Sequence, residues 1–266
     1  MPTADQLKTQ ADEFRCAGRG DRAFSRYLQA QDFYLTSDNV LEATQCMHML
    51  GVTLVFEDRA DEGQKALKAA LEAYQQLRNT LGIAQVQRDQ GIACLINRRY
   101  LTALDWLIKS RKSLLNSDQL AERAITEAKI GRLYALDGEY GQVDGCFNEA
   151  YLLLSKDEHI AYQITANIDN AFACLELAQI GHMSNHIDTA WALLVQSGEM
   201  LVQKRQVLQI TGLRVRLAIN QKDWHQARAI FKSEFLPLLD DLSPGNQASL
   251  NREIDIDQLK KDLSLP

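Results

Sequence analysis

Prolines and long apolar runs are scarce in this chain of 266 residues. It contains only four prolines, so little interrupts a helix, and its apolar runs are only a few residues long. A membrane-spanning helix needs about 20 apolar residues, so no segment is predicted to cross a bilayer. The first residues carry acids and amides where a signal peptide would have a basic start and an apolar core. We therefore do not expect secretion.

The cysteines do not form the patterns that disulfides or metal sites require. There are five of them, far apart and without a CxxC pair, so we expect reduced core thiols in a cytoplasmic protein. Cys174, His182 and His186 form one candidate metal site, because histidines four residues apart share a helix face. These residues straddle an expected helix end and lack a fourth ligand, so we predict no metal and no cofactor.

Charge argues against nucleic acid as a partner. The formal net charge is −6, and residues 121–266 hold 14 basic and 20 acidic side chains. Non-specific binding to nucleic acid depends on many cationic contacts with phosphates, which an acidic chain does not supply. With 46% hydrophobic and 24% charged residues, the chain is also too apolar to be disordered.

Catalytic motifs are missing as well. The sequence contains no phosphate-binding loop, zinc-protease helix or serine-hydrolase elbow. Gly18-x-Gly20 follows a predicted helix rather than a strand, so it is not a dinucleotide loop. We therefore predict that the protein is not an enzyme. If it were one, His48 with Arg88 would be the pair to examine.

The chain does contain an internal repeat of forty residues. Gly91 has a small residue forty positions before it, Gly51, and another forty after it, Gly131. Ala11 and Ala171 extend the series in both directions. A small, a bulky and a small residue follow the first four anchors at offsets of 12, 16 and 19, with one larger exception at Val143: Ala23, Tyr27, Ala30; Gly63, Leu67, Ala70; Ala103, Leu107, Ser110; Val143, Phe147, Ala150. Such a period predicts an array of helix pairs.

The 3.6-residue apolar period and the short polar breaks predict an all-α fold of about six antiparallel helix pairs. We expect a single solenoid over 1–266, with one more amphipathic helix as a cap over its last repeat. The predicted repeats and cap are 4–37, 40–79, 80–117, 118–156, 157–203, 204–238 and 245–263.

The fifth repeat departs from the pattern. The next small residue expected in its second helix, Ala190, lies 19 positions after Ala171 instead of 12, a surplus of seven. Seven residues are close to two helical turns, so the first helix can lengthen and keep the same face buried. Leu177-Ala178 is then an equally good anchor, and the sequence does not choose between the two registers.

The repeat resembles the tetratricopeptide repeat (TPR), whose helices cross at a small residue. The segments GIAC…YLTALDWLIKS (Gly91–Ser110) and GRLYALDGEY (Gly131–Tyr140) carry the likeness. Four copies in phase over nearly the whole chain make it specific, although forty residues exceed the usual thirty-four. The resemblance implies a right-handed α-solenoid whose first helices line a concave groove. Longer repeats of this kind occur in kinesin light chains, cell-polarity adaptors and bacterial peptide-pheromone receptors.

The same resemblance implies which side chains face the groove. They lie three before the small anchor, one after it, and one turn before the first of these positions. A polar group in the fifth repeat joins them. The predicted residues are Gln45, His48, Gln85, Arg88, Arg132, Asn167 and Asn170. A groove with these cations would suit an acidic or carboxylate-ended peptide, because arginine binds carboxylates with two parallel hydrogen bonds. The alternative is that the charges are ordinary solvated helix surface.

Two functions follow from this interpretation. The first is a non-catalytic scaffold or adaptor that binds a peptide or helix of a partner protein in the groove. The alternative is a peptide-responsive regulatory subunit that acts on another protein. The sequence identifies neither the partner nor the oligomeric state.

Overall fold

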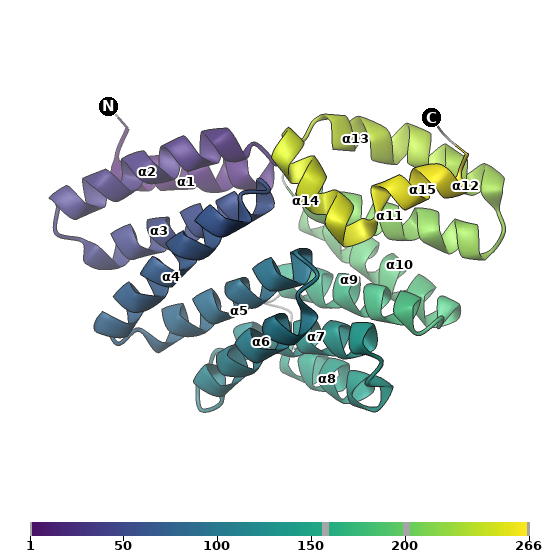
Figure 1. Cartoon of the computed structure of the whole chain (residues 1–266), viewed down its shortest axis with the longest axis horizontal. Coiled ribbons are helices and arrows are strands. Elements are labelled where there is room, and N and C mark those ends of the chain that lie inside the picture. Colours follow the sequence, from purple (N-terminus) through teal and green to yellow (C-terminus); the bar gives the residue numbers. More distant parts are fainter. Residues whose placement is uncertain (1, 156–159, 199–202, 265–266) are drawn as a thin grey trace. The chain divides into compact units, whose positions relative to one another are not determined.

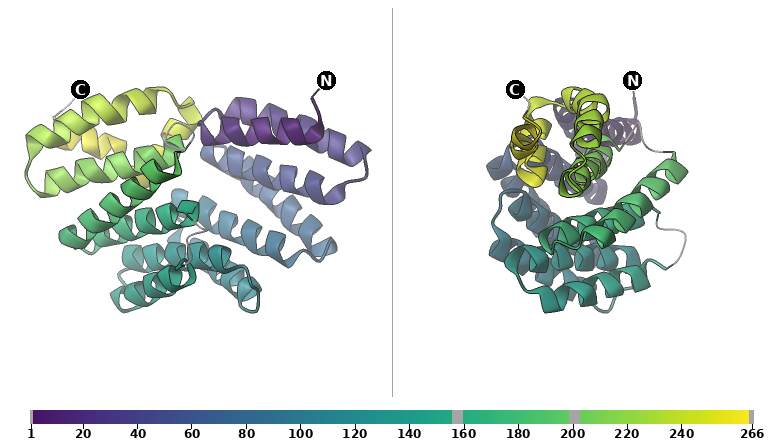
Figure 2. Two further views of the ribbon diagram at one scale, coloured as in Figure 1. Left: turned by 180° about the vertical axis from the view of Figure 1, so that it is seen from behind. Right: turned by 90° about the vertical axis from the view of Figure 1, so that its right-hand side faces the viewer.

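The computed structural model describes residues 2–155, 160–198 and 203–264, and within these ranges it consists of helices and contains no strand. The helices follow one another along the chain as antiparallel pairs (Figures 1 and 2). The prediction of an all-α helical-repeat fold is therefore confirmed. The helices are α1 (Ala4–Cys16), α2 (Gly20–Thr36), α3 (Val40–Phe56), α4 (Ala60–Gln76), α5 (Thr80–Ile96), α6 (Tyr100–Leu114), α7 (Leu120–Asp137), α8 (Tyr140–Leu153), α9 (Ile160–Glu176), α10 (Ile180–Ser197), α11 (Lys204–Asn220), α12 (Trp224–Ile230), the π-helical turn η2 (Phe231–Phe235), α13 (Leu236–Asp240), α14 (Pro244–Ile254) and α15 (Ile256–Asp262).

Contacts divide the chain into two compact units. Unit 1 comprises Met1–Asn116 and Leu242–Ser249, and unit 2 comprises Ser117–Asp241 and Leu250–Pro266. Unit 1 therefore holds the pairs α1/α2, α3/α4 and α5/α6, while unit 2 holds α7 to α13 and α15. Helix α14 supplies residues to both. The prediction of one continuous solenoid over 1–266 stays a prediction.

Two details of the predicted boundaries lie outside the described residues. They are the border between the fourth and fifth repeats at 156–157 and the last part of the fifth repeat at 199–202. In the part of the chain that can be described, no helix has the length and hydrophobicity needed to cross a membrane.

The turns between the helices share one backbone conformation. A residue in the left-handed conformation follows helix after helix at multiples of twenty residues: Gly18, Asp38, Asp58, Arg78, Arg98, Gly138, Ala178 and Gly198. Wherever the residue after the left-handed one is described, its N–H donates to the carbonyl five residues earlier. Arg59, for example, donates to the carbonyl of Leu54 at 2.9 Å, which closes the helix end. These turns reverse the chain within three residues, so successive helices are antiparallel neighbours.

Small residues lie where the paired helices cross, as the forty-residue phase predicts. A Cβ added to Gly51 would stand 2.8 Å from Cγ of Leu67, and one on Gly131 would stand 2.9 Å from Cε2 of Phe147. Nothing larger than hydrogen fits at these contacts without a shift of the partner helix. The small and bulky positions of the second helices are fully buried as well, among them Ala23, Tyr27, Ala30, Leu67, Ala70, Ala103 and Leu107.

The expected lengthening of the first helix of the fifth repeat by seven residues is wrong. Helix α9 has the same 17 residues as α3 and α5 and contains Ala171, whereas Ala178 lies in the following turn with φ 54°. The positions 12, 16 and 19 residues after Ala171 are Met183, Ile187 and Ala190, and all three are buried residues of α10. The repeat therefore stays in phase, and Met183 fills the position where a small residue was expected.

The end of the chain differs from the predicted single cap helix. Asp255 is left-handed, with φ 54°, so the cap breaks into α14 and α15. Its carboxylate accepts the N–H of Gln258 and caps the new helix. Within unit 2, the cap residues Leu250, Ile254, Leu259 and Leu263 are buried.

Candidate functional site

Each unit has a set of polar side chains on its first helices, joined in unit 2 by Glu253 of α14. The sets are called the unit 1 cluster and the unit 2 cluster and are described separately. The unit 1 cluster comes from α1, α3 and α5: Lys8, Glu42, Gln45, His48, Gln85, Arg88 and Asp89. The unit 2 cluster comes from α7, α9, α11 and α14: Lys129, Arg132, Asp169, Arg205, Gln209 and Glu253.

In unit 1, the predicted residues His48 and Arg88 converge on a carboxylate. Nε2 of His48 lies 2.8 Å from Oδ2 of Asp89, and Nε of Arg88 donates to Oδ1 of Asp89 at 3.0 Å. His48 is buried, and its ring packs edge-on against the ring of Tyr74, with the two ring centroids 6.1 Å apart. His48 and Arg88, which were predicted to bind a carboxylate of a ligand, thus contact a carboxylate of the protein itself.

The two predicted glutamines of unit 1 are half-buried on the same helices. Gln45 on α3 accepts a hydrogen bond from Nζ of Lys8 at 2.5 Å, and Lys8 also pairs with Glu42 at 2.6 Å. Gln85 lies on α5, one turn before Arg88. The structure therefore brings Lys8 together with Gln45, a link between α1 and α3.

Burial and charge act in opposite directions on Asp89. Burial by itself would raise the pKa of its carboxyl. The charge of Arg88 and the hydrogen bond from His48 outweigh burial and hold the pKa at about 2, below the ordinary value of 3.8. Because the folded form releases this proton more readily than the unfolded chain, the ionised carboxylate stabilises the fold above about pH 4. That contribution disappears as the pH falls toward 2.

Asp89→Asn should therefore lower the free energy of unfolding by roughly 2 kcal/mol at pH 7, the amount that the difference between 3.8 and about 2 represents. The gap between wild type and variant should narrow between pH 4 and pH 2.5. Urea denaturation of both proteins across this range measures it. A gap that stays constant with pH would contradict the assignment of an ionised, paired Asp89.

In unit 2, a fully buried carboxylate joins two first helices. Asp169 on α9 has no exposed surface, and Nζ of Lys129 on α7 lies 2.9 Å from its Oδ2. Nη1 of Arg132, one turn further along α7, donates to Oδ1 of Asp169 at 3.2 Å. Asp169 is thus held by two cations of the neighbouring helix.

A second carboxylate of unit 2 comes from the cap. Oε1 of Glu253 accepts from Nη1 of Arg132 at 3.1 Å and from Nε2 of Gln209 at 2.8 Å, while Oε2 accepts from Nη2 of Arg205 at 2.8 Å. Burial would raise the pKa of Glu253, but Arg205, Arg132 and Lys129 outweigh it and hold the pKa at about 2. Glu253 is therefore an ionised acid in a built carboxylate site.

Arg132 is placed to serve both carboxylates. Its guanidinium lies 3.9 Å from the ring centroid of Phe172 on α9, which fixes its plane by a cation–π contact. The side chain is 6% exposed, and its Nε has no hydrogen-bond partner. The predicted carboxylate-binding residue thus does bind carboxylates, and both belong to this chain.

Asn167 and Asn170 point to a different part of unit 2. Oδ1 of Asn167 lies 3.0 Å from Nδ1 of His186, and Nδ2 of Asn170 donates to the hydroxyl of Tyr151 at 3.1 Å. These partners lie on the second helices α10 and α8, whereas Asp169 between them contacts α7. Burial lowers the pKa of His186, so the ring is less readily protonated than an ordinary histidine.

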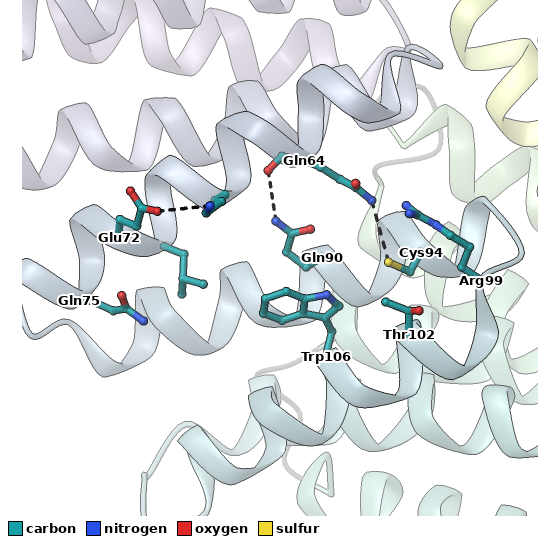
Figure 3. A pocket seen from close by; sticks show the side chains of 10 residues that line it. Gln64, Glu72, Gln75, Gln90, Cys94, Arg99, Thr102 and Trp106 are labelled. Carbon is teal, nitrogen blue, oxygen red and sulfur yellow. Dashed lines mark hydrogen bonds and ion pairs between the residues drawn. The ribbon is translucent and has the colours of Figure 1, made fainter.

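A pocket of about 460 Å³ opens in unit 1 between α4, α5 and α6 (Figure 3). Nε2 of Gln90 donates to the carbonyl of Gln64 at 3.3 Å beside Trp106, and Cys94 lies one turn further along α5. Its lining is mixed: Gln64, Lys68, Leu71, Glu72, Gln75, Gln90, Cys94, Arg99, Thr102 and Trp106. Its charged groups carry both signs, so it lacks the convergent cations of the unit 2 cluster. No motif in the sequence predicted this pocket.

The repeat pattern also gave no prediction of Lys129, Arg205, Gln209 and Glu253. One signal was available, because residues about forty apart face one another on neighbouring first helices. Lys129 and Asp169 are forty apart, and His48 and Asp89 are 41 apart. No such rule reaches Glu253, which is 121 residues from Arg132 and lies outside the repeats. Across the described ranges, no group of three or more His, Cys, Asp or Glu residues is placed to hold a metal ion.

Helix pairs with small residues at their crossings, repeated every forty residues, define a TPR-like fold. Two solved structures are similar to it. One is a Rap protein complexed with Competence and Sporulation Factor, with a TM-score of 0.64 and 14% identity over 98% of this chain. The other is the Rap conjugation gene regulator of the plasmid pLS20 in complex with the Phr* peptide, with a TM-score of 0.65 and 15% identity over 98% of this chain.

The chain spans only 64% and 65% of the length of these two proteins. No family model and no curated protein matches the sequence. Identities of 14% and 15% mean that the likeness concerns the fold.

Proposed function

We propose that this protein is a non-catalytic adaptor that binds an acidic segment of a partner protein at the unit 2 cluster. The observation that carries the proposal is the convergence of Arg132 from α7 and of Arg205 and Gln209 from α11 on one carboxylate. Two guanidinium groups and an amide bind a carboxylate strongly where water is excluded. The Phr* peptide held by one of the similar structures supports this class of partner.

The unit 1 cluster is a second proposed contact for such a segment, through Gln45, His48, Gln85 and Arg88. The side chain of Arg88 is 16% exposed and that of His48 is 3% exposed, so Arg88 is the more accessible of these two basic residues. We place the adaptor in the cytoplasm, without cofactor. Each of the five cysteines, all of which are described, is a thiol rather than half of a disulfide.

A peptide-responsive regulatory subunit is the second candidate. One similar structure is a conjugation gene regulator that holds a peptide, which favours this function. In this case binding at the unit 2 cluster would change the affinity of the chain for another protein. A change in that affinity with bound peptide would distinguish the regulator from a passive adaptor.

The test uses two fluorescein-labelled peptides. The acidic probe, GEIDIDEIDIDG, alternates acids with isoleucine, and the amide probe, GQININQINING, replaces each acid by its amide. We expect the full chain to bind the acidic probe at least about tenfold more tightly, as two or more charged hydrogen bonds imply. Fluorescence anisotropy measures both dissociation constants, and the difference should shrink at high salt.

Arg205→Ala should remove most of this preference, because it deletes one of the three donors while Arg132 still pairs with Asp169. Arg214→Ala is the matched control. It removes an arginine from the same helix whose partner, Glu234, lies outside the cluster. Equal binding of the two probes by the wild type, or an unchanged preference in Arg205→Ala, would contradict the proposed function.

A further inference from the structure

The carboxylate in the unit 2 cluster belongs to the segment Leu250–Leu263, called the cap here. We infer that Glu253 is an internal ligand, and that an acidic partner segment binds only when its own carboxylate replaces that of Glu253. This inference rests on the proposed function of the same site. It adds that the chain regulates its own binding site through its C-terminal segment.

The first support is that Glu253 already accepts the hydrogen bonds that a partner carboxylate would need. Glu253 engages Arg205 and Gln209 and shares Nη1 of Arg132 with Asp169. Its side chain is only 8% exposed, so a second carboxylate cannot reach the same three donors while Glu253 stays in place. Exchange of one carboxylate for another keeps every ion pair of the cluster, whereas simple departure would cost Arg132 and Arg205 their ion pairs with Glu253.

The second support is the backbone next to Glu253. Helix α14 ends one residue later at Ile254, and Asp255 is left-handed, with φ 54°, so the two helices do not continue into one another. The carbonyls of Ile254 and Asp255 are held by Nη2 of Arg216 at 2.9 and 3.4 Å. Glu253 thus lies beside a break between two helices, so a shift of the backbone there would break the contacts of Arg216 but leave the middle of both helices wound.

The third support is the sequence around Glu253, which indicates the partner. Glu253 to Asp257 reads EIDID, an alternation of acids with isoleucine in which Ile254 and Ile256 are buried. A segment that replaces it must offer an acid for the cluster and a branched apolar residue next to it. The partner class is therefore a protein segment that alternates acidic and apolar residues.

Glu253→Gln should raise the affinity of the full chain for the acidic probe at least tenfold. The amide has no charge for the arginines, so it competes less well than the wild-type side chain. Asp257→Asn is the matched control, since it neutralises an exposed acid of the same cap that bonds Asn251 outside the cluster. Its dissociation constant should equal that of the wild type.

Hydrogen exchange of the wild type checks the inference without a variant that could fail to fold. A saturating amount of the acidic probe should speed the exchange of backbone amides from Glu253 to Asp257, because the probe displaces this part of the cap. The amide probe should leave that exchange unchanged.

The outcomes separate the two proposals. If Arg205→Ala loses the acidic probe while Glu253→Gln binds it like the wild type and exchange in the cap does not change, the site is real and Glu253 does not compete for it. If neither the wild type nor Glu253→Gln prefers the acidic probe, the proposed function fails and the inference falls with it. Higher affinity in both cap variants would show loosening of the cap rather than release of Glu253.

Discussion

Gly91→Leu should lower the free energy of unfolding by about 3 kcal/mol, the upper end of the range for overpacking a core. A Cβ at this position would already lie 2.8 Å from Cγ of Leu107 and 3.2 Å from the carbonyl oxygen of Ala103. The leucine side chain adds three more carbons in the same direction, so α5 and α6 must separate. Urea denaturation followed by circular dichroism measures the change.

Gly145→Leu is the control for this substitution. Gly145 lies inside α8, but a Cβ built on it meets nothing within 4 Å. Leucine has a higher helix propensity than glycine, so here the same change should stabilise the protein by about 0.5 kcal/mol. Loss of stability in both variants, or in neither, would show that close helix crossing is not the reason for the glycine at 91.

Asp169→Ala should have an equally large effect, about 3–5 kcal/mol, because it leaves buried cations without their acid. Lys129 is only 11% exposed and has Asp169 at 2.9 Å. Lys129→Met in the Asp169→Ala background should restore part of the loss by removing one of the stranded charges. The thermal midpoints and urea midpoints of the single and double variants measure this coupling.

Glu149→Ala provides the matched comparison. Glu149 also pairs with a cation of α7, Arg123 at 3.5 Å, but its side chain is 43% exposed. Exposed pairs contribute about 0–1 kcal/mol, so this variant should be nearly as stable as the wild type. A similar cost for Asp169→Ala and Glu149→Ala would mean that the unit 2 cluster is no more than surface charge.

The fold was predictable because one feature repeats. Glycine at 51, 91 and 131 marks the helix crossings directly, since few other residues fit where two backbones approach. The fifth repeat was misread because Met183 takes a position where a small residue was expected. Methionine is flexible enough to fill an irregular gap there, so size alone was a poor guide to the register.

The cap was only half predictable. Its apolar spacing correctly indicated a helical segment that packs on the last repeat, but the break at Asp255 has no strong signal in the sequence. Aspartate adopts the left-handed conformation more easily than most residues and caps helices well, yet it does so at few of its occurrences. Here the contacts of Arg216 with two carbonyls fix the break.

The candidate site was predictable in three of its basic residues and not in its acids. His48, Arg88 and Arg132 were found because they stand at fixed offsets from glycine anchors. Asp89 and Glu253 are acids of the same chain that pair with these basic residues, so the basic residues are not simply open to a ligand. Glu253 comes from outside the repeats, so the period carries no information about it.

The central claim is that the unit 2 cluster is a carboxylate site held by the cap until a partner acid replaces it. A crystal structure of the full chain grown with saturating acidic probe tests this most directly. We predict a probe carboxylate within hydrogen-bond distance of Arg132 and Arg205, with the side chain of Glu253 displaced. A probe bound elsewhere, with Glu253 still bonded to both arginines, would contradict the claim.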